Sequence, residues 1–194
     1  EVEEPDGTIR YHHGRQNLSA AIDLALDHFP DMKKVLIFGS SAGGYGTFFA
    51  MPMMRMAYPQ AELFVVADSG LGLQDTEKTD DINTRLEEWK YRVPPSCVSC
   101  DGGRGQSTEL VTWALENDAG LTASMASYDQ DMVIGGVYLG LEGPAYKELL
   151  LEETDKIRAR FPDRFKRFLI AGASHVVGLD YNGAQIEDVT YARW

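Results

Sequence analysis

The chain of 194 residues lacks two features that would each indicate a class of partner. No apolar run reaches the ~18 residues that a membrane-spanning helix requires, so we predict no membrane span. Positive charge is not in excess either, because 30 Asp and Glu outnumber 18 Lys and Arg and give a net charge of −12. An acidic protein repels phosphate backbones, which argues against nucleic acid as a partner.

Cysteine is also scarce, since the chain has only Cys97 and Cys100. Two cysteines are too few for a zinc site with about four ligands, and the four histidines add no second ligand pair. The Cys pair follows Pro-Pro and precedes Asp-Gly-Gly, which indicates a loop rather than the helix start of a redox motif. We predict a local disulfide, with free thiols as the alternative, and no metal or cofactor. A disulfide favours a secreted or periplasmic location.

What the sequence does contain is an alternation of short apolar runs with helical patterns. This alternation predicts an α/β fold whose mostly parallel sheet has helices on both faces. Strands are expected at 8–12, 34–38, 62–67, 121–128 and 165–171. Helices are expected at 17–29, from about 43, at 108–117, from 132 and at 144–161, and the second of these is expected to be kinked or to end near Pro52. The irregular segment 71–106, with a short helix near 82–89, is predicted to be a lid-like insertion in a single domain spanning 1–194.

Residues 39–43 read Gly-Ser-Ser-Ala-Gly and match the G-x-S-x-G nucleophile elbow of α/β-hydrolases. An apolar strand precedes the motif and a helical pattern follows it, as the elbow requires. Ser41 is therefore the predicted nucleophile, and the Ala42 amide is the predicted oxyanion donor at the helix N-terminus. Ser40 is in the wrong register. A chemically inert Gly-rich turn is the alternative, whereas a phosphate-binding loop would need a lysine that is missing here.

A serine nucleophile needs a base and an orienting carboxylate, which follow it in this fold in the order Ser, acid, His. His175 comes after the last clear strand and is the only histidine beyond Ser41, so it is the predicted base. Three carboxylates compete for the third role. Asp131 is favoured because a helix is expected directly after it, Asp129 is the second choice, and Asp68 is the third.

These motifs resemble the pectin acetylesterase family, which includes the carboxylesterase Notum. The resemblance rests on Phe-Gly-Ser-Ser-Ala-Gly-Gly-Tyr-Gly at 38–46, on Val-Ala-Asp-Ser-Gly at 66–70, and more loosely on segments 11–17, 131–134 and 172–175. It implies an α/β-hydrolase fold and a Ser-His-Asp esterase without a cofactor, which removes acyl groups from polysaccharides or proteins. The expected bacterial-type acid motif has Gln where this chain has Ile134.

The family also places a second oxyanion donor in a G-G-x-W segment on an early strand, and nothing before residue 39 matches it. We therefore expect the first strands of the sheet to be missing and the 194 residues to be the C-terminal portion of a larger enzyme. An N-terminal segment or a second chain is then the expected partner that covers the open sheet edge.

The sequence thus predicts a serine carboxylic-ester hydrolase, a deacetylase of O-acetylated glycans or similar short-chain esters. Two alternatives stay open: a peptidase or thioesterase on the same fold, and a non-catalytic binding domain that retains the hydrolase architecture.

Overall fold

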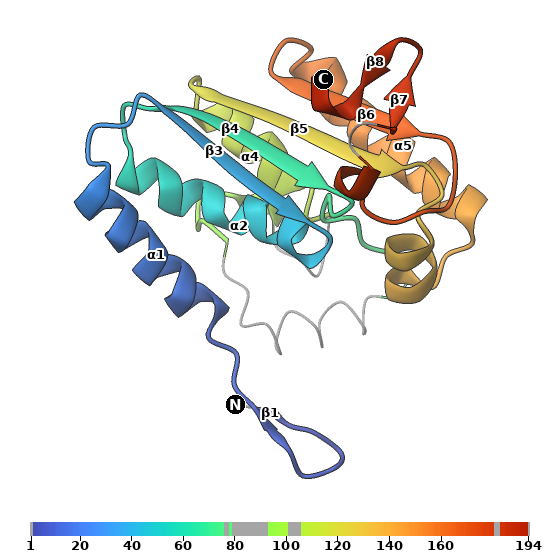
Figure 1. Cartoon of the computed structure of the whole chain (residues 1–194), viewed down its shortest axis with the longest axis horizontal. Helices are drawn as coiled ribbons and strands as arrows, with labels where there is room; N and C mark the ends of the chain where they lie inside the picture. Colours follow the sequence, from blue (N-terminus) through green and yellow to red (C-terminus); the bar gives the residue numbers. More distant parts are fainter. Residues whose placement is uncertain (1, 76–77, 79–92, 101–105, 181–182, 194) are drawn as a thin grey trace.

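The computed structural model describes residues 2–75, 78, 93–100, 106–180 and 183–193. Within these ranges the centre of the molecule is a four-stranded parallel sheet in the order β3-β4-β5-β6 (Figure 1). The strands are β3 Lys34–Ser40, β4 Glu62–Asp68, β5 Leu121–Tyr128 and β6 Phe165–Ile170. All four run in the same direction, so their carboxyl ends meet at one edge. The predicted α/β class with a parallel sheet is confirmed.

Helices follow or precede each strand, and they form one layer against the sheet. They are α1 Gly14–His28, α2 Ala42–Ala57, α4 Glu109–Asn117 and α5 Gly143–Arg160. Each crossover from β3 to β6 moves one strand further in the same direction, and right-handed crossovers then place α2, α4 and α5 on the same side. One continuous core fills the space between these helices and the sheet. We call this side of the sheet the helical face. α1 packs beside α2 and has no buried residue.

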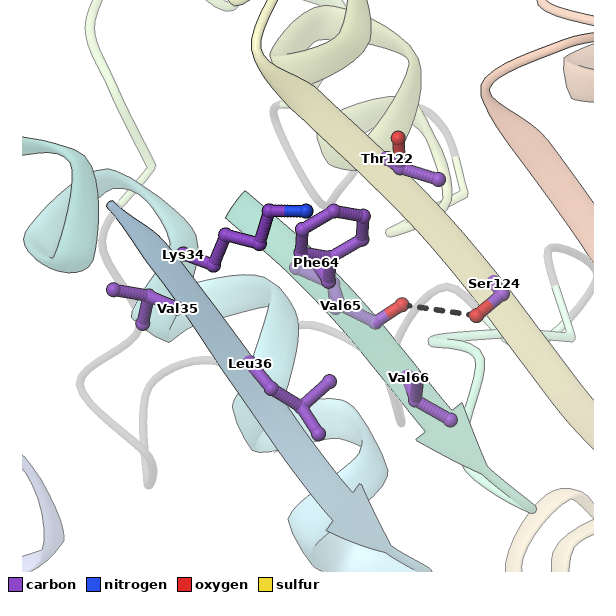
Figure 2. Close-up of a pocket in the computed structure, with 8 residues that line it drawn as sticks. All are labelled: Lys34, Val35, Leu36, Phe64, Val65, Val66, Thr122 and Ser124. Carbon is purple, nitrogen blue, oxygen red and sulfur yellow. Dashed lines mark hydrogen bonds between the residues drawn. The ribbon is translucent and has the colours of Figure 1, made fainter. Parts of the chain in front are cut away.

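The opposite side of the sheet, which we call the open face, differs from the prediction of helices on both faces. The C-terminal segment covers its β5–β6 half, where Val177 and Tyr191 pack on Phe168. Over β3, by contrast, Leu36 and Phe38 are 64% and 54% exposed. A hollow of about 410 Å³ lies on this side near the amino ends of the strands, and Figure 2 shows the β3, β4 and β5 residues that line it. The hollow is thus at the far end of the sheet from the predicted nucleophile.

One local prediction is wrong, and two others are made more definite by the structure. The expected strand at 8–12 is only Ile9–Arg10 (β2), which pairs with Val2–Glu3 (β1) in a small antiparallel ribbon outside the main sheet. Of the two alternatives at Pro52, an end of the helix is excluded, because α2 continues through the proline to Ala57. The helix expected from 132 is a π-helix over Met132–Leu139.

The two ends of the predicted insertion at 71–106 lie side by side. The Gln74 amide N–H donates to Gln106 Oε1 at 2.7 Å, and Gln106 Nε2 donates to the Gln74 carbonyl at 2.6 Å. Cys97 and Cys100 form the predicted disulfide and are buried against the core, so that prediction is confirmed. The short helix expected near 82–89 lies outside the described residues.

Two further short strands lie near the C-terminus, where Gln185–Ile186 (β7) and Val189–Thr190 (β8) form a hairpin beside β6. Across the portion of the chain that the structure describes, every helix is too short or too polar to cross a membrane.

Candidate active site

Ser41 lies between the end of β3 and the first turn of α2, as the elbow motif predicts. Its backbone has φ 56° and ψ −123°, a region that non-glycine residues adopt only at a cost of order 1–3 kcal/mol. The turn is tight because its neighbours lack side chains. A Cβ at Gly39 would overlap the carbonyl of Gly43, and a Cβ at Gly70 would overlap the carbonyl of Ser41. Small residues here let β3, α2 and the end of β4 meet, which presents the Ser41 hydroxyl at the carboxyl edge of the sheet.

His175 reaches this hydroxyl from the loop that follows β6. Its Nε2 lies 2.8 Å from Ser41 Oγ, although the two residues are 134 positions apart in the chain. The side chain is 18% exposed, so one edge of the ring remains open to solvent and to a substrate. The predicted nucleophile and base are therefore within direct hydrogen-bonding distance.

Asp131 holds the other nitrogen of this imidazole. Its Oδ2 and Oδ1 lie 2.8 and 3.1 Å from His175 Nδ1. Oδ1 also accepts the backbone N–H groups of Val133 and Ile134 at 2.9 and 3.0 Å, the second and third residues of the π-helix. The side chain is fully buried, so these contacts fix its orientation. An Nδ1–H that donates to Asp131 leaves Nε2 as the acceptor for the Ser41 hydroxyl.

Tyr146 is a buried phenol close to Asp131. Tyr146 on α5 is buried against the π-helix, and a Cβ at Gly135 would lie only 2.7 Å from its ring. Burial raises the pKa of the Tyr146 phenol well above its usual range, and the negative charge of Asp131 raises it further. The phenol therefore adds no negative charge beside Asp131, even in moderately alkaline solution.

The other two candidate carboxylates bind backbone rather than the imidazole. Asp129 Oδ1 accepts the Gly172 N–H at 3.0 Å, and its Oδ2 pairs with Lys147 Nζ at 2.6 Å. Asp68 is fully buried, and its two carboxylate oxygens accept the backbone N–H groups of residues 177 and 178. Of the three carboxylates considered, the structure thus brings Asp131 to His175.

The predicted oxyanion donor also lies at this edge. Ala42 is the first residue of α2, where a helix leaves its amides without intrahelical partners, and its side chain is exposed. His12 and His13, by contrast, are exposed on the approach to α1, where His13 pairs with Gln16. Within the described ranges, the His, Cys, Asp and Glu side chains form no group suited to hold a metal ion.

Sequence reasoning missed two residues of this site, Ser69 and Val176. Among the described residues four non-glycine residues have positive φ, and three of them are here: Ser41 at 56°, Ser69 at 55° and Val176 at 65°. The Val176 N–H donates to Ser69 Oγ at 3.1 Å. A β-branched residue in this conformation is an outlier whose surroundings must hold it in place. The Ala-Asp-Ser-Gly segment at 67–70 was the available signal, because it ends a strand beside the elbow.

Comparison with known proteins adds no family to this geometry, because neither the protein-family models nor the curated proteins contain a match to the chain.

Proposed function

We propose that this chain carries the catalytic residues of a serine carboxylic-ester hydrolase. The observation that supports the proposal is the unbroken chain of hydrogen bonds from Ser41 Oγ through His175 to Asp131, with both contacts at 2.8 Å. A hydroxyl, an imidazole and a buried carboxylate in this order form the arrangement that activates serine as a nucleophile. The strained elbow adds support, because strain of this kind concentrates at functional sites.

In the proposed reaction the Ser41 oxygen attacks the ester carbonyl carbon while His175 Nε2 accepts the hydroxyl proton. The carbonyl electron pair moves to oxygen, and the Ala42 N–H at the start of α2 donates a hydrogen bond to that oxyanion. When the tetrahedral intermediate collapses, the C–O bond to the alcohol breaks and Nε2 protonates the leaving alkoxide. The serine is then acylated.

Deacylation repeats these steps with water as the nucleophile. His175 takes a proton from water, the hydroxide adds to the acyl carbon, and Nε2 returns the proton to Ser41 as the acid leaves. Asp131 stays ionised throughout and stabilises the imidazolium that forms in both halves.

The proposed substrates are short-chain acyl esters such as O-acetylated glycans. This choice rests on the likeness of segments 38–46 and 66–70 to the pectin acetylesterase family, and membership of that family is part of the proposal. The net charge of −12 disfavours a densely anionic polymer and so favours neutral glycans. The disulfide between Cys97 and Cys100 supports the accompanying proposal of a secreted or periplasmic protein.

The test compares two adjacent serines in the purified protein. Hydrolysis of p-nitrophenyl acetate should fall to the buffer rate in Ser41→Ala, whereas Ser40→Ala should retain most of the wild-type rate. A fluorophosphonate probe should label wild type at Ser41, as peptide mass spectrometry would show. Equal rates in wild type and Ser41→Ala, together with no labelling, would leave a non-catalytic binding domain as the better description.

A substrate panel then separates ester hydrolysis from other acyl transfer on the same fold. Acetyl esters, longer acyl esters, thioesters and amides are compared by kcat/KM. We expect the acetyl esters to lead. A thioester or an amide with the highest value would replace the esterase proposal by a thioesterase or a peptidase.

A further inference from the structure

Two buried polar residues at the end of β4 are not used by the chemistry described so far. Asp68 and Ser69 are both fully buried, and together they bind three consecutive backbone amides of the loop after His175. Ser69 Oγ accepts the N–H of residue 176 at 3.1 Å, and Asp68 accepts those of residues 177 and 178 at 2.9 and 2.6 Å. Ser69 Oγ also donates to Asp68 Oδ1 at 3.1 Å, which joins the two side chains into one acceptor group.

Asp68 also contacts the proposed nucleophile Ser41 through its main chain. The Ser41 N–H donates to the Asp68 carbonyl at 2.8 Å, and β3 and β4 pair in register up to Ser40 and Asp68. Gly70 then lies so close to Ser41 that a Cβ there would overlap the Ser41 carbonyl. Asp68 therefore contacts the strand that carries the nucleophile and the loop that carries the base.

These contacts matter because the loop after His175 is not in a relaxed conformation. Val176 has φ 65°, which a β-branched residue adopts only when its surroundings impose it. A buried carboxylate is also stable only when hydrogen-bond donors compensate its lost hydration, and the amides of 177 and 178 supply them. The carboxylate and the strained loop thus stabilise one another.

We infer that Asp68, assisted by Ser69, is a positioning residue that sets the distance between Ser41 and His175. The inference rests on the proposed hydrolase function. Asp68 reaches neither the imidazole nor the substrate in this role; it acts through the backbone on both sides of the Ser41–His175 hydrogen bond. Misplacement of reacting groups by about 1 Å can cost about 10²-fold in rate.

The direct test is Asp68→Asn, which keeps the shape of the side chain and replaces one acceptor oxygen by an NH₂ group that would face a backbone N–H. We expect kcat for p-nitrophenyl acetate to fall about 10- to 100-fold, with KM changed less than about twofold. Rates are expressed per active site titrated with the fluorophosphonate probe, so that unfolded molecules do not count. A purely structural role would lower the titratable fraction and leave kcat per titrated site unchanged.

Glu153→Gln is the matched control for a buried carboxylate changed to its amide. Glu153 on α5 is 6% exposed, and its partners are Thr108 Oγ1 at 2.9 Å and Lys156 Nζ at 2.7 Å, neither of which belongs to the candidate site. It should lower the melting temperature and keep the wild-type kcat per titrated site. If Asp68→Asn does not fold, Ser69→Ala provides the same test, because it removes the acceptor for residue 176 and should lower kcat by a smaller factor.

The outcomes distinguish a failure of the positioning role from a failure of the hydrolase proposal. If wild type hydrolyses the ester, Ser41→Ala does not, and both Asp68→Asn and Ser69→Ala keep the wild-type kcat per titrated site, the positioning role is wrong and the hydrolase proposal stands. If wild type itself neither hydrolyses the ester nor reacts with the probe, the hydrolase proposal fails and the positioning role with it.

Discussion

The helical face and the open face belong to the same four strands, yet they are built differently. On the helical face, alternate strand residues such as Leu63 and Val65 are 1% exposed and join one core with α2, α4 and α5. On the open face of β3, Leu36 and Phe38 are more than half exposed, and only the β5–β6 half is covered by the C-terminal segment. Buried apolar area is what stabilises a fold, so most of the stability should come from the helical face, with a smaller share from the covered β5–β6 half of the open face.

The proposed catalytic residues lie at the edge of the sheet where this difference disappears. At the carboxyl edge, β3 turns into α2 on the helical face, while the side chain of Asp68 meets the C-terminal segment on the other side of the sheet. Polar contacts replace apolar packing there, and they are dense: Ser41, His175 and Asp131 are joined by hydrogen bonds, and the last is fixed by two further amides. Packing on one face thus supplies the scaffold, and hydrogen bonds at the edge supply the geometry of the candidate site.

The largest effect on the free energy of unfolding is expected when leucine is replaced by alanine on the helical face rather than on the open face. Leu115 on α4 is 0% exposed, and Leu115→Ala should lower the free energy of unfolding by about 2–5 kcal/mol through lost burial and the cavity left behind. Leu36→Ala on the open face should lower it by less than about 0.5 kcal/mol. Urea denaturation at unchanged m-value measures both. Similar losses for the two variants would mean that the open face is packed as well.

The next effect tests whether tight packing on the helical face extends into the elbow. A Cβ at Gly39 would overlap the backbone of Gly43, so Gly39→Ala should cost about 1–3 kcal/mol and abolish ester hydrolysis. Gly43→Ala is the control, because a Cβ there meets nothing within 4 Å and alanine favours a helix. Its free energy of unfolding should be unchanged or higher by up to about 1 kcal/mol. A Gly39→Ala protein as stable as wild type would show that the turn is looser than described.

A pH effect compares tyrosines on the two sides of the sheet. Burial raises the pKa of Tyr146 on the helical face and of Tyr191 on the opposite side, with a smaller contribution from Asp131 and Asp68 respectively. A raised folded-state pKa means that the unfolded chain loses its phenolic proton first, so the stability contribution is complete below pH ~10 and is lost as pH rises further.

Between pH ~10 and the raised pKa, Tyr146 should therefore remove about 1.4 kcal/mol of stability per pH unit. Tyr146→Phe should flatten the fall in unfolding free energy above pH 10 when urea titrations are repeated at each pH. Tyr191→Phe should flatten it less, because Tyr191 is only half-buried. If both variants keep the wild-type slope, neither phenol is protected in the folded state.

Much of the helical face and of the site could be predicted from the sequence. The apolar runs at 34–38 and 121–128 fix two strands, and an elbow motif carries its own geometry, so Ser41 could be placed without a structure. The order of residues along the chain identifies His175 as the predicted base. Asp131 is preferred over Asp129 because a helix is expected directly after it. In the π-helix found there, the amides of Val133 and Ile134 donate hydrogen bonds to the Asp131 carboxylate.

The rest depended on contacts between distant segments. Sequence periodicity shows that Leu36 alternates with Val35, but it does not show which face is covered, because that depends on where crossovers and the C-terminal segment go. α2 continues through Pro52 because its other turns are packed, so tertiary contacts outweigh the local preference of proline. The contact of Ser69 with Val176 joins residues 107 positions apart, and no local pattern encodes it.

The smallest effect on stability is expected for a substitution of Phe38, and a large effect there would contradict the difference between the two faces. Phe38 is 54% exposed on the open face, so Phe38→Thr, which keeps a strand-favouring residue, should change the free energy of unfolding by less than about 0.5 kcal/mol. The substitution should nevertheless reduce binding of the dye ANS, because it removes part of an exposed apolar surface around Leu36 and Phe38. A loss of stability like that of Leu115→Ala, with no change in dye binding, would mean that Phe38 is buried in solution. The open face would then be a second packed face, and the division of the sheet into a stabilising side and an exposed side would no longer hold.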